Sequence, residues 1–119
     1  MTGQKRNVIK EKSYEFALEI ISLCQEMRKE KEYFLSKQLV RSGTSIGANV
    51  EEASAAQSRK DFVAKMAISS KEARETHYWL RLIEDSRICN RLNVKPLIVE
   101  CEELIRLLTS IVKTSQEST

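Results

Sequence analysis

The chain has 119 residues, a length that suits one domain, and 20 basic against 17 acidic side chains give it a net charge of +3. Hydrophobic residues make up 41% and charged residues 31%, which excludes both a disordered chain and a membrane-embedded one. With 3 glycines, 1 proline and 6% aromatic residues, the composition also disfavours a many-turned all-β fold and a glycine-rich phosphate loop. We therefore expect a soluble helical domain that is less basic than a typical nucleic-acid binder.

Apolar residues recur at helical spacing in a first segment over residues 8–29, with Asn7 as a candidate N-cap. Its main stripe consists of Ile9, Phe16, Ile20, Leu23, Cys24 and Met27. A second apolar group, on another side of the same helix, consists of Tyr14, Leu18 and Ile21. The charged run at residues 29–32 interrupts the pattern without glycine or proline and ends the segment.

Two glycines mark the second helical segment, over residues 34–56. Its apolar rhythm is kept by Leu35, Leu39, Gly43, Ile46, Val50 and Ala53. Gly43 and Gly47 lie in mid-helix, where each costs about 1 kcal/mol relative to alanine. Their four-residue spacing predicts a smooth strip where another backbone approaches closely, either within the chain or in a second subunit. A bend at this Gly/Ser cluster is the alternative.

The sequence Ser58-Arg-Lys-Asp61 is a variant of the capping box and predicts the start of a third helix, over residues 59–87. The main face of this helix consists of Phe62, Met66, Ser69, Ala73 and Leu80. A second apolar group lies on a different side and consists of Ile68, Trp79 and Leu82.

A turn at residues 90–93 precedes the last segment, over residues 94–113, and Pro96 suits its first turn. One broad apolar face runs along this helix, and the polar tail at residues 114–119 is expected to fray. Four helices with short connections predict an all-α, antiparallel up-down-up-down four-helix bundle, in a single domain over residues 1–119.

One core needs one apolar stripe per helix, so the second groups on the first and third helices predict an outer surface for a partner. The candidate interface for self-association comprises Tyr14, Leu18, Ile21, Ile68, Trp79, Leu82, Gly43 and Gly47. Scattered exposed apolar side chains, or a wide core, are the alternative.

Three stretches resemble the bacterial four-helix-bundle proteins, also called 23S rRNA intervening-sequence proteins: QLVRSGTSIGANVEE at residues 38–52, SRKDF at 58–62 and AISSKEARETHYWL at 67–80. The resemblance covers nearly the whole chain and implies a cytoplasmic bacterial bundle that assembles as a ring, a homopentamer. A related branch, the accessory variability determinant of diversity-generating retroelements, is a basic pentamer that binds nucleic acid and a reverse transcriptase. This chain is less basic than that branch, and it has Asn49-Val-Glu-Glu-Ala53 where many members have Asn-x-Ala-Glu-Gly.

Motifs for catalysis, metal or cofactors are not recognisable, so we expect no enzyme activity and no cofactor. Cys24, Cys89 and Cys101 are dispersed and odd in number, which argues against a disulfide framework and fits a reducing cytoplasm. Together with His77, the one histidine, they offer no ligand spacing for zinc. We expect His77 at the edge of the core or in an interface. The sequence contains no apolar signal segment and no stretch that would span a membrane.

A polar stripe on the second helix consists of Gln38, Arg41, Ser45, Asn49 and Glu52. We expect it to form hydrogen bonds across a helix interface, with Arg41 and Glu52 in ion pairs with neighbouring elements. Ligand binding by this stripe is the alternative.

Lys71, Arg74, Tyr78 and Arg81 follow 3-4-3 spacing and therefore share one face of the third helix. The three cations can pair with phosphates, and one aromatic residue lies among them. This is the strongest candidate for a nucleic-acid-binding face in the sequence. An ion-paired, solvated face is the alternative, because acidic residues lie around it, namely Glu72, Glu75, Glu84 and Asp85. Two hypotheses follow: an oligomer that binds RNA or DNA, and a scaffold that binds another protein without nucleic acid.

Overall fold

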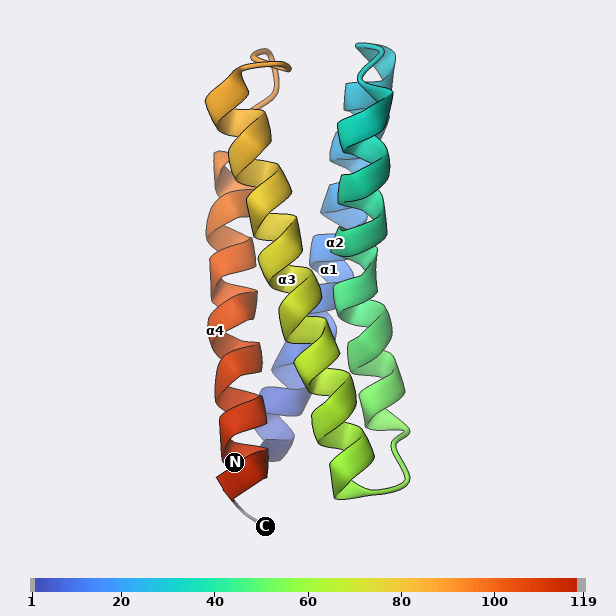
Figure 1. The fold of residues 1–119 in the computed structure, drawn as a ribbon, viewed down its shortest axis with the longest axis vertical. Coiled ribbons are helices and arrows are strands. Elements are labelled where there is room, and N and C mark those ends of the chain that lie inside the picture. The colour runs from blue at the N-terminus through green and yellow to red at the C-terminus, as the bar shows by residue number, and fades with distance from the viewer. Residues whose placement is uncertain (1, 118–119) are drawn as a thin grey trace.

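The computed structural model describes residues 2–117, and the side chains of residues 8–117. This part of the chain folds into four helices without a strand: α1 (Thr2–Lys29), α2 (Tyr33–Ser54), α3 (Arg59–Ser86) and α4 (Lys95–Glu117). Each helix packs antiparallel to the one before it, and α4 closes the bundle by packing against α1 (Figure 1). The all-α, up-down-up-down four-helix bundle is confirmed. The predicted domain of residues 1–119 includes residues 1, 118 and 119, which lie outside the described part.

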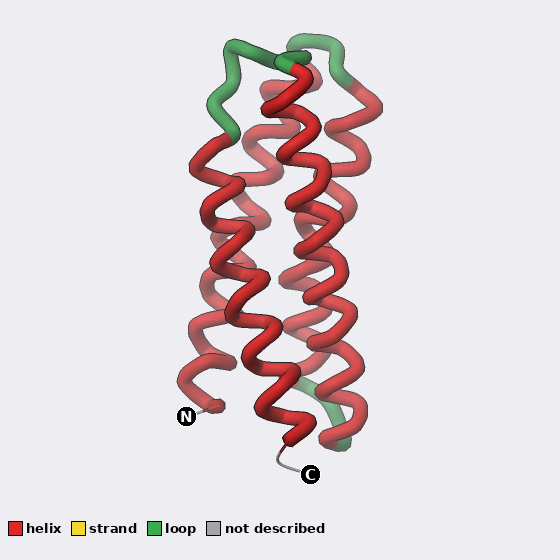
Figure 2. The backbone as a smooth tube through the Cα atoms, turned by 60° about the vertical axis from the view of Figure 1, so that its left-hand side comes forward, coloured by secondary structure: helices red, strands yellow, loops and turns green. Residues whose placement is uncertain are grey.

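The bundle is a rod of 48 × 20 × 18 Å with its loops at two ends. The α1–α2 and α3–α4 loops lie at one end, and the α2–α3 loop lies at the other, together with the first and last described residues (Figure 2). Among the described residues, no helix combines the length and the hydropathy needed to cross a membrane.

Local capping signals place two of the helix starts. Ser58 is the N-cap of α3, and its hydroxyl accepts a hydrogen bond from the backbone N–H of Asp61 at 3.0 Å. Pro96 lies in the first turn of α4, where the missing N–H leaves no helical hydrogen bond unmade. Both predictions are confirmed.

Two other helix ends differ from the prediction. Asn7 is not the N-cap of α1, because the helix begins five residues earlier, at Thr2, and asparagine is tolerated inside a helix at modest cost. The polar tail is also not frayed at its start, because α4 continues to Glu117. Ser115 lies one turn beyond Ile111 on the same side of α4 and is also buried. The buried face of α4 therefore extends beyond the last apolar residue of the pattern.

The charged run between α1 and α2 forms a tight helix-ending turn. Lys31 takes the left-handed conformation at φ 65°, its N–H donates to the Arg28 carbonyl, and the Glu32 N–H donates to the Met27 carbonyl, both at 2.9 Å. This is the Schellman arrangement that satisfies the last carbonyls of a helix. The Glu32 carboxylate then accepts from the Leu35 N–H at 3.0 Å and caps α2. One charged turn therefore ends α1 and begins α2.

The core lies between the four helices and is built from the predicted stripes. Its largest fully buried side chains are Phe16, Ile9, Ile20, Met27, Leu39, Ile46, Met66, Leu80, Leu104, Leu108, Ile111 and Val50. Leu23 and Leu35 pack against this core and are only partly buried. Cys24, Cys89 and Cys101 are buried free thiols, and burial raises the pKa of Cys24 to about 11 and that of Cys101 to about 12.

Small residues of α2 allow close helix packing inside the chain. A Cβ atom added to Gly43 would lie 2.9 Å from Ile20 Cγ2, and one added to Gly47 would lie 3.4 Å from the Ser13 carbonyl oxygen. Both neighbours belong to α1. The assignment of the two glycines to a subunit interface is therefore corrected, because they serve the contact between α1 and α2 of one chain.

Candidate nucleic-acid interface

The four residues of the predicted nucleic-acid face all have exposed side chains on α3. Arg74 Nη2 donates to the Thr109 hydroxyl of α4 at 3.3 Å, which directs this guanidinium toward α4. The Arg81 guanidinium carbon lies 5.9 Å from the centre of the Tyr78 ring, one turn along the helix, within the range of a cation–π contact. The structure thus brings Lys71, Arg74, Tyr78 and Arg81 together on one outer face, as the spacing predicts.

Two cations of α4, missing from the predicted set, lie beside this face (Figure 1 shows α3 next to α4). Lys113 lines a shallow groove of about 260 Å³ together with Arg74 and Thr109. Arg106 lies on α4 one turn before Thr109, on the same side of the helix, and is exposed. The α3/α4 basic face is defined here by its five cations, Lys71, Arg74, Arg81, Arg106 and Lys113. The 4-3-4 spacing of residues 102, 106, 109 and 113 is the sequence signal for these additions.

Ion pairs join neighbouring helices at the other three contacts of the bundle, called seams below: α1/α2, α1/α4 and α2/α3. Lys10 pairs with Glu51 between α1 and α2 at 3.8 Å. Lys12 pairs with Glu103 between α1 and α4 at 3.3 Å. Three pairs span α2 and α3: Lys65 with Glu52 at 2.8 Å, Arg41 with Glu72 at 3.4 Å, and Arg41 with Glu75. The α3/α4 contact has a pair of its own near the α3–α4 loop, Lys95 with Glu84 at 3.8 Å.

The five cations of the α3/α4 basic face form no ion pair with any described side chain. Three of the four acidic residues expected to neutralise them are engaged elsewhere. Glu72 and Glu75 face α2, where both pair with Arg41, and Glu84 lies 3.8 Å from the Lys95 amine. The ion-paired alternative for this face therefore loses most of its expected partners.

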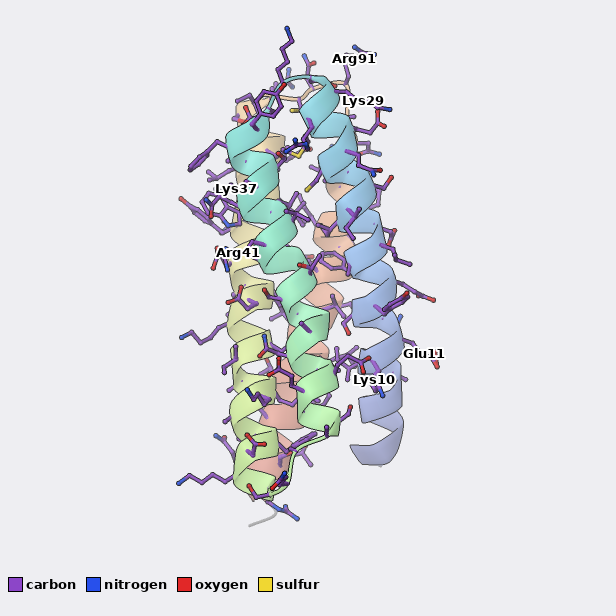
Figure 3. All side chains as sticks on the ribbon, turned by 90° about the vertical axis from the view of Figure 1, so that its right-hand side faces the viewer. Lys10, Glu11, Lys29, Lys37, Arg41 and Arg91 are labelled. Carbon is purple, nitrogen blue, oxygen red and sulfur yellow. The ribbon has the colours of Figure 1, made fainter. Side chains whose placement is uncertain are left out.

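The polar stripe of α2 fulfils part of its expected role. Arg41 and Glu52 pair with α3, as predicted, and Figure 3 shows Arg41 on the side of α2 that faces α3. Ser45 and Asn49 instead donate to backbone carbonyls of their own helix, at 2.7 and 2.9 Å. Serine and asparagine side chains are short enough to reach the preceding turn, which competes with contacts across helices.

Trp79 is held inside the α2/α3 seam by contacts with three neighbours. Its indole N–H donates to Glu75 Oε2 at 3.0 Å, and its ring makes edge contacts with Phe34 and Tyr78, with ring centres 6.5 and 5.4 Å away. The indole N–H and the Arg41 guanidinium keep the pKa of the Glu75 carboxyl below its usual value. Trp79 is thus partly covered within the chain, and Phe34, Trp79 and Tyr78 form an aromatic row across the seam.

The rest of the candidate self-association surface is exposed. Tyr14, Leu18 and Ile21 form an apolar stripe on the outside of α1, called the α1 stripe below, and Leu18 is 52% exposed. Ile68 and Leu82 are exposed on α3, at 41% and 37%. These five side chains are free of the core, as an interface requires.

Comparison with known proteins agrees with the fold. Residues 5–110 match the model of the 23S rRNA-intervening sequence protein family. The chain belongs to this family. A crystal structure from Bacteroides thetaiotaomicron, described as a protein of unknown function from the S23 ribosomal protein family, superimposes with a TM-score of 0.85. The two chains are 44% identical, and the match covers 92% of this chain and 98% of that one. No protein of curated function matches.

The one histidine of the chain, His77, is only 20% exposed, which agrees with the expected place at the edge of the core. His77 Nε2 is 3.0 Å from Glu102 Oε2, which joins α3 to α4 beside the basic face. Among the described side chains, no group of three or more His, Cys, Asp or Glu residues is placed to hold a metal ion.

Proposed function

We propose that this protein is a non-catalytic bundle that binds nucleic-acid phosphates through the α3/α4 basic face. One observation carries the proposal: the five cations of this face make no ion pair with the described side chains, whereas Lys10, Lys12, Arg41 and Lys65 on the other sides of the bundle are each paired with a carboxylate. Cations without an ion-pair partner are available to phosphates, and phosphate contacts supply most of the non-specific affinity for nucleic acid.

Self-association is part of the same proposal. The α1 stripe offers an exposed apolar surface, and a ring of subunits would repeat the basic face and so compensate for a net charge of only +3. The number five and a cytoplasmic location rest on the family resemblance alone. A second copy of this chain is the expected occupant of the stripe.

The test is a titration of nuclease-treated protein against labelled structured RNA and duplex DNA. Five phosphate contacts predict a loss of about 500-fold in affinity between roughly 50 and 200 mM salt. Absence of binding even at the lower salt concentration would overturn the proposal.

A pair of double variants locates the binding face. Arg74→Gln/Arg106→Gln removes two charges from the basic face, and we expect the salt slope of binding to fall by about 2. Lys10→Gln/Lys29→Gln removes the same charge from the α1/α2 side, seen in Figure 3, and serves as the matched control. Equal losses in the two variants would show that net charge, and not this face, governs binding. Circular dichroism checks that both variants fold.

A protein-interaction scaffold without nucleic acid is the second candidate, and the exposed α1 stripe favours it. It predicts a stoichiometric complex with one protein partner that survives nuclease treatment, together with no RNA or DNA binding at low salt.

A further inference from the structure

The aromatic row crosses the α2/α3 seam and ends beside the basic face. Phe34 begins the row on α2 and is 64% exposed, Trp79 is half-buried in the middle, and Tyr78 ends the row on α3 at 49% exposure. The Arg81 guanidinium lies over the Tyr78 ring, so the last ring of the row and a basic-face cation are in contact. The exposed aromatic surface of the row therefore adjoins the basic face, whose cations have no ion-pair partners.

Trp79, the middle residue of the row, is held by a charged network. Glu75 accepts the indole N–H of Trp79 and pairs with Arg41, which also pairs with Glu72. Trp79 is thereby locked between two helices, and its ring contacts the rings on either side at steep angles, 87° with Phe34 and 65° with Tyr78. Phe34 and Tyr78 each pack against this fixed ring, and restrained aromatic side chains lose less conformational entropy when a ligand stacks on them.

Phosphate binding alone does not require exposed rings, because cations suffice to bind a duplex backbone. Bases in a duplex are stacked on one another and leave no face for a side chain, whereas unpaired bases stack on aromatic rings of a protein. The Tyr78–Arg81 contact places a stacking ring within the basic face. A phosphate bound there would carry its own base close to the ring.

We propose that the aromatic row makes this face selective for unpaired nucleotides, in RNA or DNA, whose bases stack on Tyr78 and Phe34 while the phosphates contact Arg74 and Arg81. The inference rests on the proposed function, since it names the class of nucleic acid that the basic face prefers.

The experiment compares a labelled single strand of about 12 nucleotides, as RNA and as DNA, with a duplex of the same sequence. Binding is measured by anisotropy for the wild type, Tyr78→Ala, Phe34→Ala and Tyr78→Phe. Tyr33→Ala is the matched control, because Tyr33 is another exposed tyrosine with an arginine over its ring, Arg28 at 5.5 Å, yet it lies outside the row. Size-exclusion chromatography with light scattering follows the assembly state of each variant.

We expect Tyr78→Ala to weaken single-strand binding by about 5- to 100-fold and to leave duplex binding unchanged. Phe34→Ala should act in the same direction, whereas Tyr78→Phe and Tyr33→Ala should bind like the wild type. Trp79 is the one tryptophan of the chain, so its fluorescence reports directly on the row. It should change on titration with single strands and stay constant with the duplex.

The possible results distinguish failure of the inference from failure of the proposed function. If single strand and duplex both bind with the expected salt loss, but Tyr78→Ala leaves their ratio unchanged, the stacking inference is overturned and the proposed function stands. If neither ligand binds at low salt, the proposed function fails, and the inference fails with it. If the alanine variants change the assembly state and not the affinity ratio, the row is a contact between subunits and the inference is wrong.

Discussion

Gly43 and Gly47 lie on neighbouring turns of α2 and face α1, yet the space beside them differs. A Cβ atom at Gly43 would meet three atoms of the fully buried Ile20 at 2.9 to 3.3 Å, nearer than carbon atoms pack without a shift. Ile20 is branched at Cβ and packed on all sides, so it has little freedom to move. At Gly47 the nearest atoms belong to Ser13 and lie 3.4 Å away, an ordinary contact distance.

Alanine substitutions at these two glycines should therefore have opposite effects on stability. Gly43→Ala overpacks the α1–α2 contact, and we expect it to lower the free energy of unfolding by about 1–2 kcal/mol despite the gain in helix propensity. Gly47→Ala gains the propensity without a clash and should raise the same free energy by up to about 1 kcal/mol. Urea denaturation measures both. A stabilising Gly43→Ala would show that Ile20 moves aside easily.

At the scale of elements, the α1/α4 seam carries a group of carboxylates around one amine. Glu100 of α4 is partly buried there and hydrogen-bonds Glu19 of α1, with Glu103 beside it. Lys12 and Glu15 of α1 line the same small cavity of about 190 Å³ as Glu100. The pKa of Glu100 is raised to about 7, chiefly by burial. The hydrogen bond and charge of Glu19 and the charge of Glu103 raise it further, and the positive charge of Lys12 lowers it only in part.

This seam should make stability depend on pH near neutrality. The pKa of Glu100 rises from 4.5 to about 7 on folding, so the folded chain binds an extra proton in that window and loses stability as pH increases through it. Glu100→Gln removes the effect, and at pH 8 we expect it to be more stable than the wild type by about 1 kcal/mol, less than the full shift implies because solvent reaches the seam.

Urea unfolding at pH 5 and pH 8 gives the comparison for Glu100→Gln. Glu11→Gln, which alters an exposed carboxylate of α1 seen in Figure 3, is the control. If the stability of Glu100→Gln depends on pH as that of the wild type does, a group other than Glu100 causes the pH dependence.

At the scale of the whole molecule, the surface divides into regions of different chemistry. The α3/α4 side carries cations without ion-pair partners among the described residues, the α2/α3 side carries ion pairs and the aromatic row, and the outside of α1 carries the apolar α1 stripe. Because these regions lie on different sides of one rod, a subunit can contact a second copy through α1 and still present its basic face.

Self-association through the α1 stripe predicts that Leu18→Glu disrupts the assembly. A charge at the centre of an apolar contact is costly to desolvate, so light scattering should show the wild type as an assembly and Leu18→Glu as a monomer of 13.7 kDa. Val99→Glu, which alters another exposed aliphatic residue on α4, is the control and should assemble like the wild type. A monomeric wild type, or a Leu18→Glu variant that still assembles, would contradict the prediction.

The sequence by itself determines which residues form helices and which side of each helix is buried. A repeat near 3.6 residues marks the core stripes, and a hydroxyl at Ser58 or a proline at Pro96 acts on backbone groups within a few residues. Such signals are local, so one chain segment suffices to read them. The start of α1 and the end of α4 escaped prediction because packing against neighbouring helices extends a helix beyond its own signals.

The tertiary structure alone decides which outer faces meet. The positions of Arg106 and Lys113 beside Arg74, and the position of Trp79 between Phe34 and Tyr78, depend on how α2 and α4 are rotated against α3. A helix periodicity gives the direction of each side chain relative to its own axis, but the rotation between helices is set by the packing of all four stripes at once. For this reason the four-helix architecture was predictable apart from the start of α1 and the end of α4, whereas the basic face was predictable only on α3.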